Sequence, residues 1–98
     1  MFTELSDRAI LKTLGERIKA YRINNGMKQS EVAAESGVGL TTINKIENGK
    51  PVSVLLLISV LRTLNLLENL SLLVPEPKIS PLQLLEIQKK QPKRVRKT

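Results

Sequence analysis

The sequence predicts an all-α fold, a bundle of four to five short helices that contains a helix-turn-helix and is followed by one short strand. This prediction rests on apolar residues at helical spacing through residues 8–64, on a glycine between two short helical segments, and on capping residues at the helix ends. A chain of 98 residues is long enough for one small domain with a tail. Because so short a chain buries only a limited core, dimerisation would add to its stability.

The first and fourth helices of the expected bundle are amphipathic. The first spans residues 8–24, with Ser6 or Asp7 as its cap, and Asn25-Gly26 ends it because these residues accept left-handed geometry. The fourth follows the capping residue Ser53 and reaches residue 64. The residues expected on the buried faces are Leu11, Leu14, Ile18 and Tyr21 in the first helix and Val54, Leu57, Ile58, Leu61 and Leu64 in the fourth.

Residues 29–50 are typical of a helix, a tight turn and a second helix. Ala33 is small enough for the point where two short helices cross, and Gly37 supplies the positive φ that a sharp turn needs. Gly39 stands at the N-cap of the second helix, where it offers no side-chain oxygen. The residues expected to hold this second helix against the bundle are Val38, Ile43 and Ile46.

The exposed face of the second helix carries side chains that suit the edges of DNA bases. Asn44 could pair bidentately with adenine, and Lys45 could donate to guanine O6 or N7. Leu40 and the methyl group of Thr41 could contact thymine methyl groups. A good bidentate contact contributes about 1–3 kcal/mol of discrimination between bases. The predicted base-reading residues are therefore Leu40, Thr41, Asn44 and Lys45.

Polar residues around the two helices are predicted to contact DNA phosphates. Gln29 begins the first helix of the motif, where a backbone N–H and a side-chain amide can hold a phosphate. Glu47 faces away from the expected DNA side, and we expect it to pair with a basic residue of the first helix. The predicted phosphate contacts are Gln29, Lys28, Thr42, Asn48 and Lys50.

The segment after Asn65 has a different pattern. Leu70, Leu72 and Val74 alternate with their neighbours, and Pro75 follows, which predicts a short strand. A lone strand cannot satisfy its own backbone groups, so the same strand of a second copy is the expected partner, which gives a homodimer. The alternative is a last helical turn or coil that covers the core. Residues 8–74 then form the DNA-binding and dimerisation domain.

Residues 75–98 are expected to form a Pro-containing spacer, a short amphipathic segment capped by Ser80, and a disordered polybasic tail. The chain carries a net charge of +7, but residues 89–98 hold six of its 16 basic residues and no acid. The remaining 10 basic and 9 acidic residues leave the rest of the chain at +1. Overall basicity is therefore weak evidence for a nucleic-acid partner.

Composition argues against several classes of function. The chain has no Cys and no His, so thiol chemistry, zinc ligation and most acid–base schemes lose their usual groups. We expect no enzyme activity, no metal and no cofactor. Only Phe2 and Tyr21 are aromatic, which disfavours single-strand or RNA binding by stacking. The longest apolar run, residues 54–58, is too short to span a membrane, and we expect a cytoplasmic protein.

Residues 14–67 resemble the Xre/Cro family of lambda-repressor-like DNA-binding domains. The resemblance implies a compact bundle of four or five helices, usually dimeric, on palindromic operators with half-sites about 34–36 Å apart. It also places the family's base-reading residues at the four positions named above and its phosphate-binding glutamine at Gln29. The residues that carry the resemblance are Gln29, Ala33, Gly37-Val38, Thr42-Ile43, Ile46-Glu47, Asn48-Gly49 and the helix after Ser53.

Two departures from the family pattern are Gly39 at the cap and the strand-like residues 69–74, where many members carry a fifth helix. The second departure resembles HipB-type antitoxins, whose dimers are joined by such a strand. Residues 68–91 also resemble small regulators that accompany HipA-like toxin kinases. This resemblance implies a repressor of its own operon that binds a Ser/Thr kinase-like toxin. The alternatives are a phage or restriction–modification controller without a toxin partner, and a protein-interaction module that keeps the fold without binding DNA.

Overall fold

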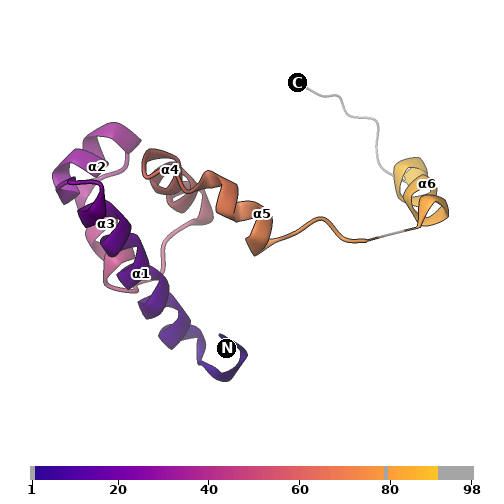
Figure 1. Cartoon of the computed structure of the whole chain (residues 1–98), viewed down its shortest axis with the longest axis horizontal. Helices are drawn as coiled ribbons and strands as arrows, with labels where there is room; N and C mark the ends of the chain where they lie inside the picture. The colour runs from indigo at the N-terminus through magenta and orange to yellow at the C-terminus, as the bar shows by residue number, and fades with distance from the viewer. Residues whose placement is uncertain (1, 79, 91–98) are drawn as a thin grey trace.

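The helices of the predicted bundle are present in the computed structural model, which describes residues 2–78 and 80–90 (Figure 1). Every regular element within these ranges is helical, so the all-α prediction is confirmed. The first and fourth α-helices agree closely with the bounds expected from the sequence, and the second and third lie within the expected residues 29–50. In chain order the elements are η1 (Phe2–Glu4), α1 (Asp7–Asn24), α2 (Gln29–Ser36), α3 (Leu40–Glu47), α4 (Val54–Thr63), η2 (Leu67–Asn69), α5 (Leu70–Leu73) and α6 (Pro81–Lys90).

Local sequence signals fix the ends of these helices. The hydroxyl oxygen of Ser6 accepts from the backbone N–H of Ala9, and that of Ser53 accepts from Leu56, so both expected N-caps are confirmed. Gly37 ends α2 with a φ of 74°, in the left-handed region. This turn lets α3 start only a few residues later at a steep angle to α2.

A small apolar core holds the bundle together. Helix α1 packs on α3, and α2 packs on both α3 and α4. The buried apolar side chains are Ile18, Val32, Val38, Ile43, Ile46, Val60 and Leu64. The expectation that Val54, Leu14 and Tyr21 lie on buried faces is wrong, because they are 68%, 36% and 46% exposed. Leu14 and Tyr21 lie on a side of α1 that borders an open groove. The inward face of α4 runs through Val60 and Leu64, and Val54 lies at the edge of that face in the first turn.

Gly15 allows α1 to approach α3 closely. A Cβ atom at this position would collide with the carbonyl oxygen of Ile46 and would lie 2.9 Å from that of Glu47. The end of α3 therefore rests directly on the backbone of α1. Glycine here serves close contact between helices, although its φ is that of an ordinary helical residue.

The predicted strand at Leu70, Leu72 and Val74 is wrong. Leu70 and Leu72 lie in the single turn α5 and Val74 is its C-cap, and the N–H of Val74 donates to the carbonyl oxygen of Leu70 at 3.1 Å. A helical turn satisfies its backbone groups locally and needs no partner strand, and leucine favours helix over strand. Alternation over six residues was too short to distinguish the two. Leu72 and Val74 are nonetheless 80% and 77% exposed.

Helix α6 lies apart from the bundle, at the far end of an extended linker (Figure 1). Ser80 caps it as expected, since its hydroxyl oxygen accepts from the N–H of Gln83 at 3.1 Å. The Gln83 side chain in return accepts from the N–H of Ser80. Of the predicted polybasic tail, residues 91–98 lie outside the described residues.

Candidate nucleic-acid interface

Helix α3 has one buried face and one exposed face. Ile43 and Ile46 are buried in the core, at 1% and 5% exposure, and Glu47 lies beside them. The four residues predicted to read bases all fall on the exposed face, because a helix repeats every 3.6 residues. Thr42 is half-buried between the two faces. The structure thus brings Leu40, Thr41, Asn44 and Lys45 together on one solvent-facing side of α3.

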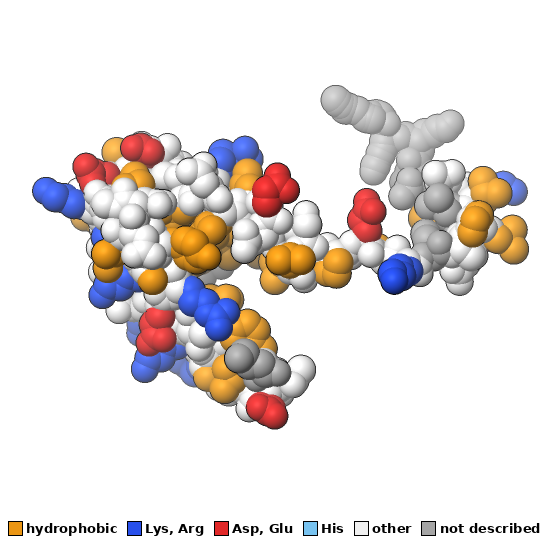
Figure 2. All heavy atoms as spheres, viewed as in Figure 1, with side chains coloured by type: hydrophobic (Ala, Val, Ile, Leu, Met, Phe, Trp, Pro, Cys, Tyr) orange, Lys and Arg blue, Asp and Glu red, His pale blue; other side chains and the backbone are white. Residues whose placement is uncertain are grey.

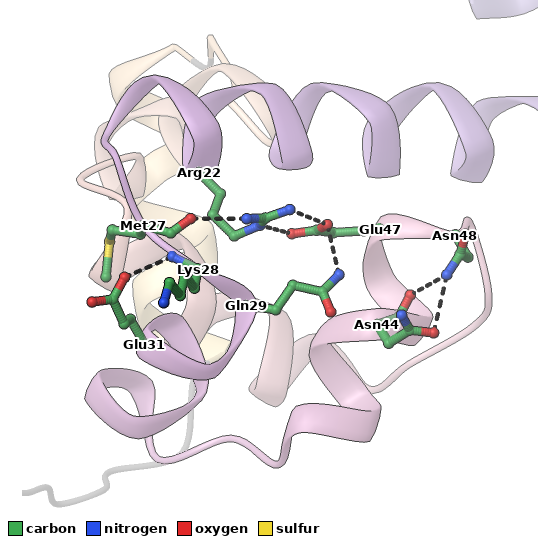
Figure 3. Close-up of polar contacts among 8 residues, drawn as sticks. All are labelled: Arg22, Met27, Lys28, Gln29, Glu31, Asn44, Glu47 and Asn48. Atoms are coloured by element: carbon green, nitrogen blue, oxygen red, sulfur yellow. Dashed lines mark hydrogen bonds and ion pairs between the residues drawn. The ribbon is translucent and has the colours of Figure 1, made fainter.

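A buried polar cluster fixes the orientation of α3 (Figure 3). The Nε atom of Arg22 in α1 donates to Oε2 of Glu47 at 2.6 Å, and its second terminal nitrogen donates to Oε1 at 3.1 Å. The remaining Arg22 nitrogen donates to the carbonyl oxygen of Met27 at 2.8 Å. From α2, Nε2 of Gln29 donates to Oε1 of Glu47 at 2.9 Å. One carboxylate therefore joins α1, α2 and α3.

This cluster is charged but fully paired. The Glu47 side chain is 3% exposed and that of Arg22 is 11% exposed. A bidentate arginine–carboxylate pair gives a buried charge both a counter-charge and good hydrogen-bond geometry. The expectation that Glu47 pairs with a basic residue of the first helix is confirmed, with Arg22 as the partner. Because Glu47 is the last residue of α3, the pair fixes that end of the helix.

Gln29 lies at the start of α2, where the phosphate contact is predicted. Its side-chain amide already donates to Glu47, which leaves one amide hydrogen and the backbone N–H groups of Gln29 and Ser30 for other partners. At the same helix end, the N–H of Lys28 donates to the Glu31 carboxylate at 2.7 Å. The Lys28 residue itself is exposed.

A pair of asparagines on the exposed side of α3 orients the amide of Asn44, which is predicted to read a base. Nδ2 of Asn48 donates to the carbonyl oxygen of Asn44 at 2.8 Å and to its Oδ1 at 3.1 Å (Figure 3). This fixes the oxygen of the Asn44 amide toward Asn48 and leaves its NH₂ group as a donor. Since an amide oxygen has two lone pairs, Oδ1 can still accept from an adenine amino group. The sequence pattern alone did not indicate this positioning role for Asn48.

An open hollow of about 670 Å³ lies beside the last turn of α3. Two cationic side chains, those of Lys45 and Lys50, stand next to two asparagine amides there. Such a mixture of charged and neutral donors suits a phosphate oxygen. The residues lining the hollow are Asn44, Lys45, Asn48, Lys50 and Pro51.

The backbone N–H groups at the N-terminus of α3 receive no side-chain cap. Gly39 occupies the N-cap, as expected, and no side chain caps the helix there. No atom lies within 4 Å of a Cβ built on Gly39. The first N–H groups of α3 are therefore open to a partner outside the chain, and a DNA phosphate is one such partner.

No group of three or more His, Cys, Asp or Glu side chains that could hold a metal ion occurs in residues 2–78 and 80–90. Among the helices described there, none is long and apolar enough to cross a membrane.

Comparison with known proteins supports this interpretation of the motif. Residues 18–68, just over half of the 98 residues, match a family model described as helix-turn-helix. The match runs from α1 to η2 and includes every residue predicted to contact a base or a phosphate. No curated protein matches the chain.

Proposed function

Because the chain belongs to the Xre/lambda-repressor-like helix-turn-helix family of DNA-binding transcription regulators, we propose that it is a sequence-specific repressor that reads DNA through α3. The observation that carries the proposal is the division of α3 into two faces. Its inner face is anchored by Ile43, Ile46 and Glu47, and its outer face holds only side chains that can meet a base edge. A helix held in this way fits the major groove of B-DNA.

The outer face gives each base-reading residue a distinct role. Asn44, oriented by Asn48, presents a donor and an acceptor to adenine, and Lys45 donates to guanine. Leu40 and the Thr41 methyl group contact thymine methyl groups at the other end of the helix. Residues around the helices then hold the backbone of the DNA, and they are Lys28, Gln29, Thr42, Asn48 and Lys50.

Direct titration of DNA tests this proposal. The DNA upstream of the gene for this chain is the first substrate, measured at two salt concentrations because phosphate contacts make affinity depend on salt. Lys45→Ala should weaken specific binding by about 1–3 kcal/mol. Lys78→Ala, the same substitution in the linker beyond α5, should leave affinity within twofold. Equal affinities for both variants would refute the assignment of Lys45 to a base.

We further propose that the protein acts as a homodimer, on an operator with two half-sites. The apolar surface of the region after Asn65 supports this proposal, since Leu72, Leu73 and Val74 are exposed. Exposed leucines in a row indicate a surface that is covered in the working assembly. Light scattering over a range of concentrations measures the mass directly.

The proposed biological role is that of an autoregulating antitoxin, which represses its own operon and binds a Ser/Thr kinase-like toxin. Its support is the resemblance of residues 68–91 to small regulators that accompany such kinases. A dimerisation strand does not support it, because residues 70–73 are helical. Co-purification with the product of the adjacent gene tests it. A stoichiometric complex with a kinase-like protein, bound to the shared upstream DNA, is the expected result. DNA binding without such a complex would favour a controller that has no toxin partner.

A further inference from the structure

An apolar groove opens between α1 and the pair α4–α5, and Figure 2 shows hydrophobic side chains gathered in this notch. Its volume is about 320 Å³. Leu14, Tyr21 and Leu73 line it and are exposed to solvent. Deeper in the groove lie Leu11, Leu57 and Leu61. A groove of this composition is filled more favourably by apolar side chains than by water.

The same chain carries an unpartnered apolar helix. Helix α6 has ten residues, and isolated helices of that length are only marginally stable in water. Its capping box with Ser80 satisfies one end but buries no apolar surface. Leu82 and Leu85 stand three positions apart and therefore share a side of α6, and both are exposed. Helix α6 thus needs a surface to pack on.

The linker between the groove and α6 begins with residues that disfavour a tight turn. Residues 74–80 start at the rim of the groove, because Leu73 lines it. Pro77 restricts Glu76 to extended geometry, which disfavours a type I turn at Pro75-Glu76, and a type II turn would need positive φ at Glu76. No Gly, Asn or Asp occurs after Asn69 to supply such a φ. A tight turn at Pro75-Glu76 is therefore disfavoured, and in the structure residues 74–78 run away from the bundle (Figure 1).

We propose that α6 of each chain docks into the groove of a second copy, so that the two chains exchange this helix across a two-fold axis. Leu82 and Leu85 fill the partner's groove, and Glu86, one turn after Leu82, meets the Arg17 side chain that lines it. When extended, residues 74–80 span about 23 Å at roughly 3.3 Å per residue, which sets the distance between the two bundles. Reciprocal exchange closes the assembly at two copies.

This inference rests on the proposed homodimer and specifies how it is joined. None of the predicted base-reading residues lines the groove, so docking leaves the outer face of α3 free in both copies. The exchange would also give the apolar side of α6 and Leu73 of α5 a buried position without a strand.

Engineered disulfides test the exchange, because the chain has no cysteine of its own. Leu14→Cys and a mass-tagged Leu85→Cys are prepared separately, mixed and oxidised. We expect a disulfide between the two different chains, and none when Leu85→Cys is mixed with Glu35→Cys, an exposed site away from the groove. If the Leu14→Cys/Leu85→Cys double variant instead links within one chain, or if no disulfide forms, the proposal is wrong.

A second variant separates this inference from the dimer itself. Leu85→Glu changes an exposed residue of α6, outside the bundle, so the bundle should still unfold cooperatively, and any loss of helical circular-dichroism signal should not exceed the ten residues of α6. Its dimer dissociation constant, measured by light scattering or sedimentation, should rise at least tenfold. A Leu85→Glu protein that dimerises as tightly as the wild type would refute the proposed helix exchange but not the proposed homodimer. A wild type that is monomeric at every concentration would overturn both.

Discussion

The bundle from α1 to α4 and the arm from η2 to α6 contain the same kinds of residue in opposite situations. Glu47 in the bundle is buried and accepts from Arg22 and Gln29, whereas Glu68 in the arm is exposed. Val60 is 1% exposed, whereas Val74 is 77% exposed. The bundle buries its ion pair together with a core of seven apolar side chains, and so it can hold α3 in a fixed orientation. From Leu72 onward the arm leaves large apolar side chains exposed, which is typical of a segment that packs on a partner.

The largest expected effect comes from the buried ion pair. Glu47→Gln removes the charge that compensates the buried Arg22 guanidinium, and breaking a buried pair costs about 3–5 kcal/mol. The free energy of unfolding from urea titrations measures this change. Glu68→Gln, the same substitution in the arm, should change it by no more than about 0.5 kcal/mol. If both substitutions lowered the free energy of unfolding by similar amounts, the stabilising charges would not be confined to the bundle.

The comparison of Val60 in the bundle with Val74 in the arm gives the next largest effect. Val60→Ala should lower the free energy of unfolding by about 2 kcal/mol, from lost burial of two methyl groups and the cavity that they leave. Val74→Ala, measured at a protein concentration where the chain is monomeric, should be within about 0.5 kcal/mol of the wild type. A large loss for Val74→Ala under those conditions would show that the arm already packs on its own bundle.

The smallest effect concerns the open N-terminus of α3. Gly39→Ser should add a side-chain cap and raise the free energy of unfolding by about a few tenths of a kcal/mol, which appears as a slightly higher melting temperature. The new side chain fits because nothing lies within 4 Å of the added Cβ. Gly37→Ser is the matched control and should lower the melting temperature, because Gly37 has a φ of 74°. A destabilised Gly39→Ser protein would contradict the extended cap geometry at this residue.

The sequence predicted the bundle well because its signals there are local. Ser53, Gly37 and the spacing of apolar residues each act within a few positions, and the structure confirms the helices that they define. Gly15 was not singled out, because the close approach that needs it involves the end of α3, some thirty residues away. The glycine within the helical pattern of α1 was the available signal.

The partner of Glu47 was predicted only as a basic residue of the first helix. That helix offers several such residues, and the choice of Arg22 depends on the angle at which α1 crosses α3. Asn48 was assigned to phosphate, whereas its bond to Asn44 depends on side-chain geometry that spacing does not specify. In the arm, the alternation of residues 69–74 predicts a strand, whereas the structure has a single helical turn there. Six residues are too few for the spacing of apolar side chains to distinguish the two.

The central claim is that the outer face of α3 reads a palindromic operator. The most direct measurement is selection of bound sequences from randomised duplex DNA, carried out in parallel with the wild type and with Asn44→Ala. We expect the wild type to select two inverted half-sites with centres about 34–36 Å apart, and Asn44→Ala to lose preference at one position in each half-site while the rest is kept. If the wild type selects no sequence, or if Asn44→Ala selects the same motif with the same preference at every position, α3 does not read bases as described.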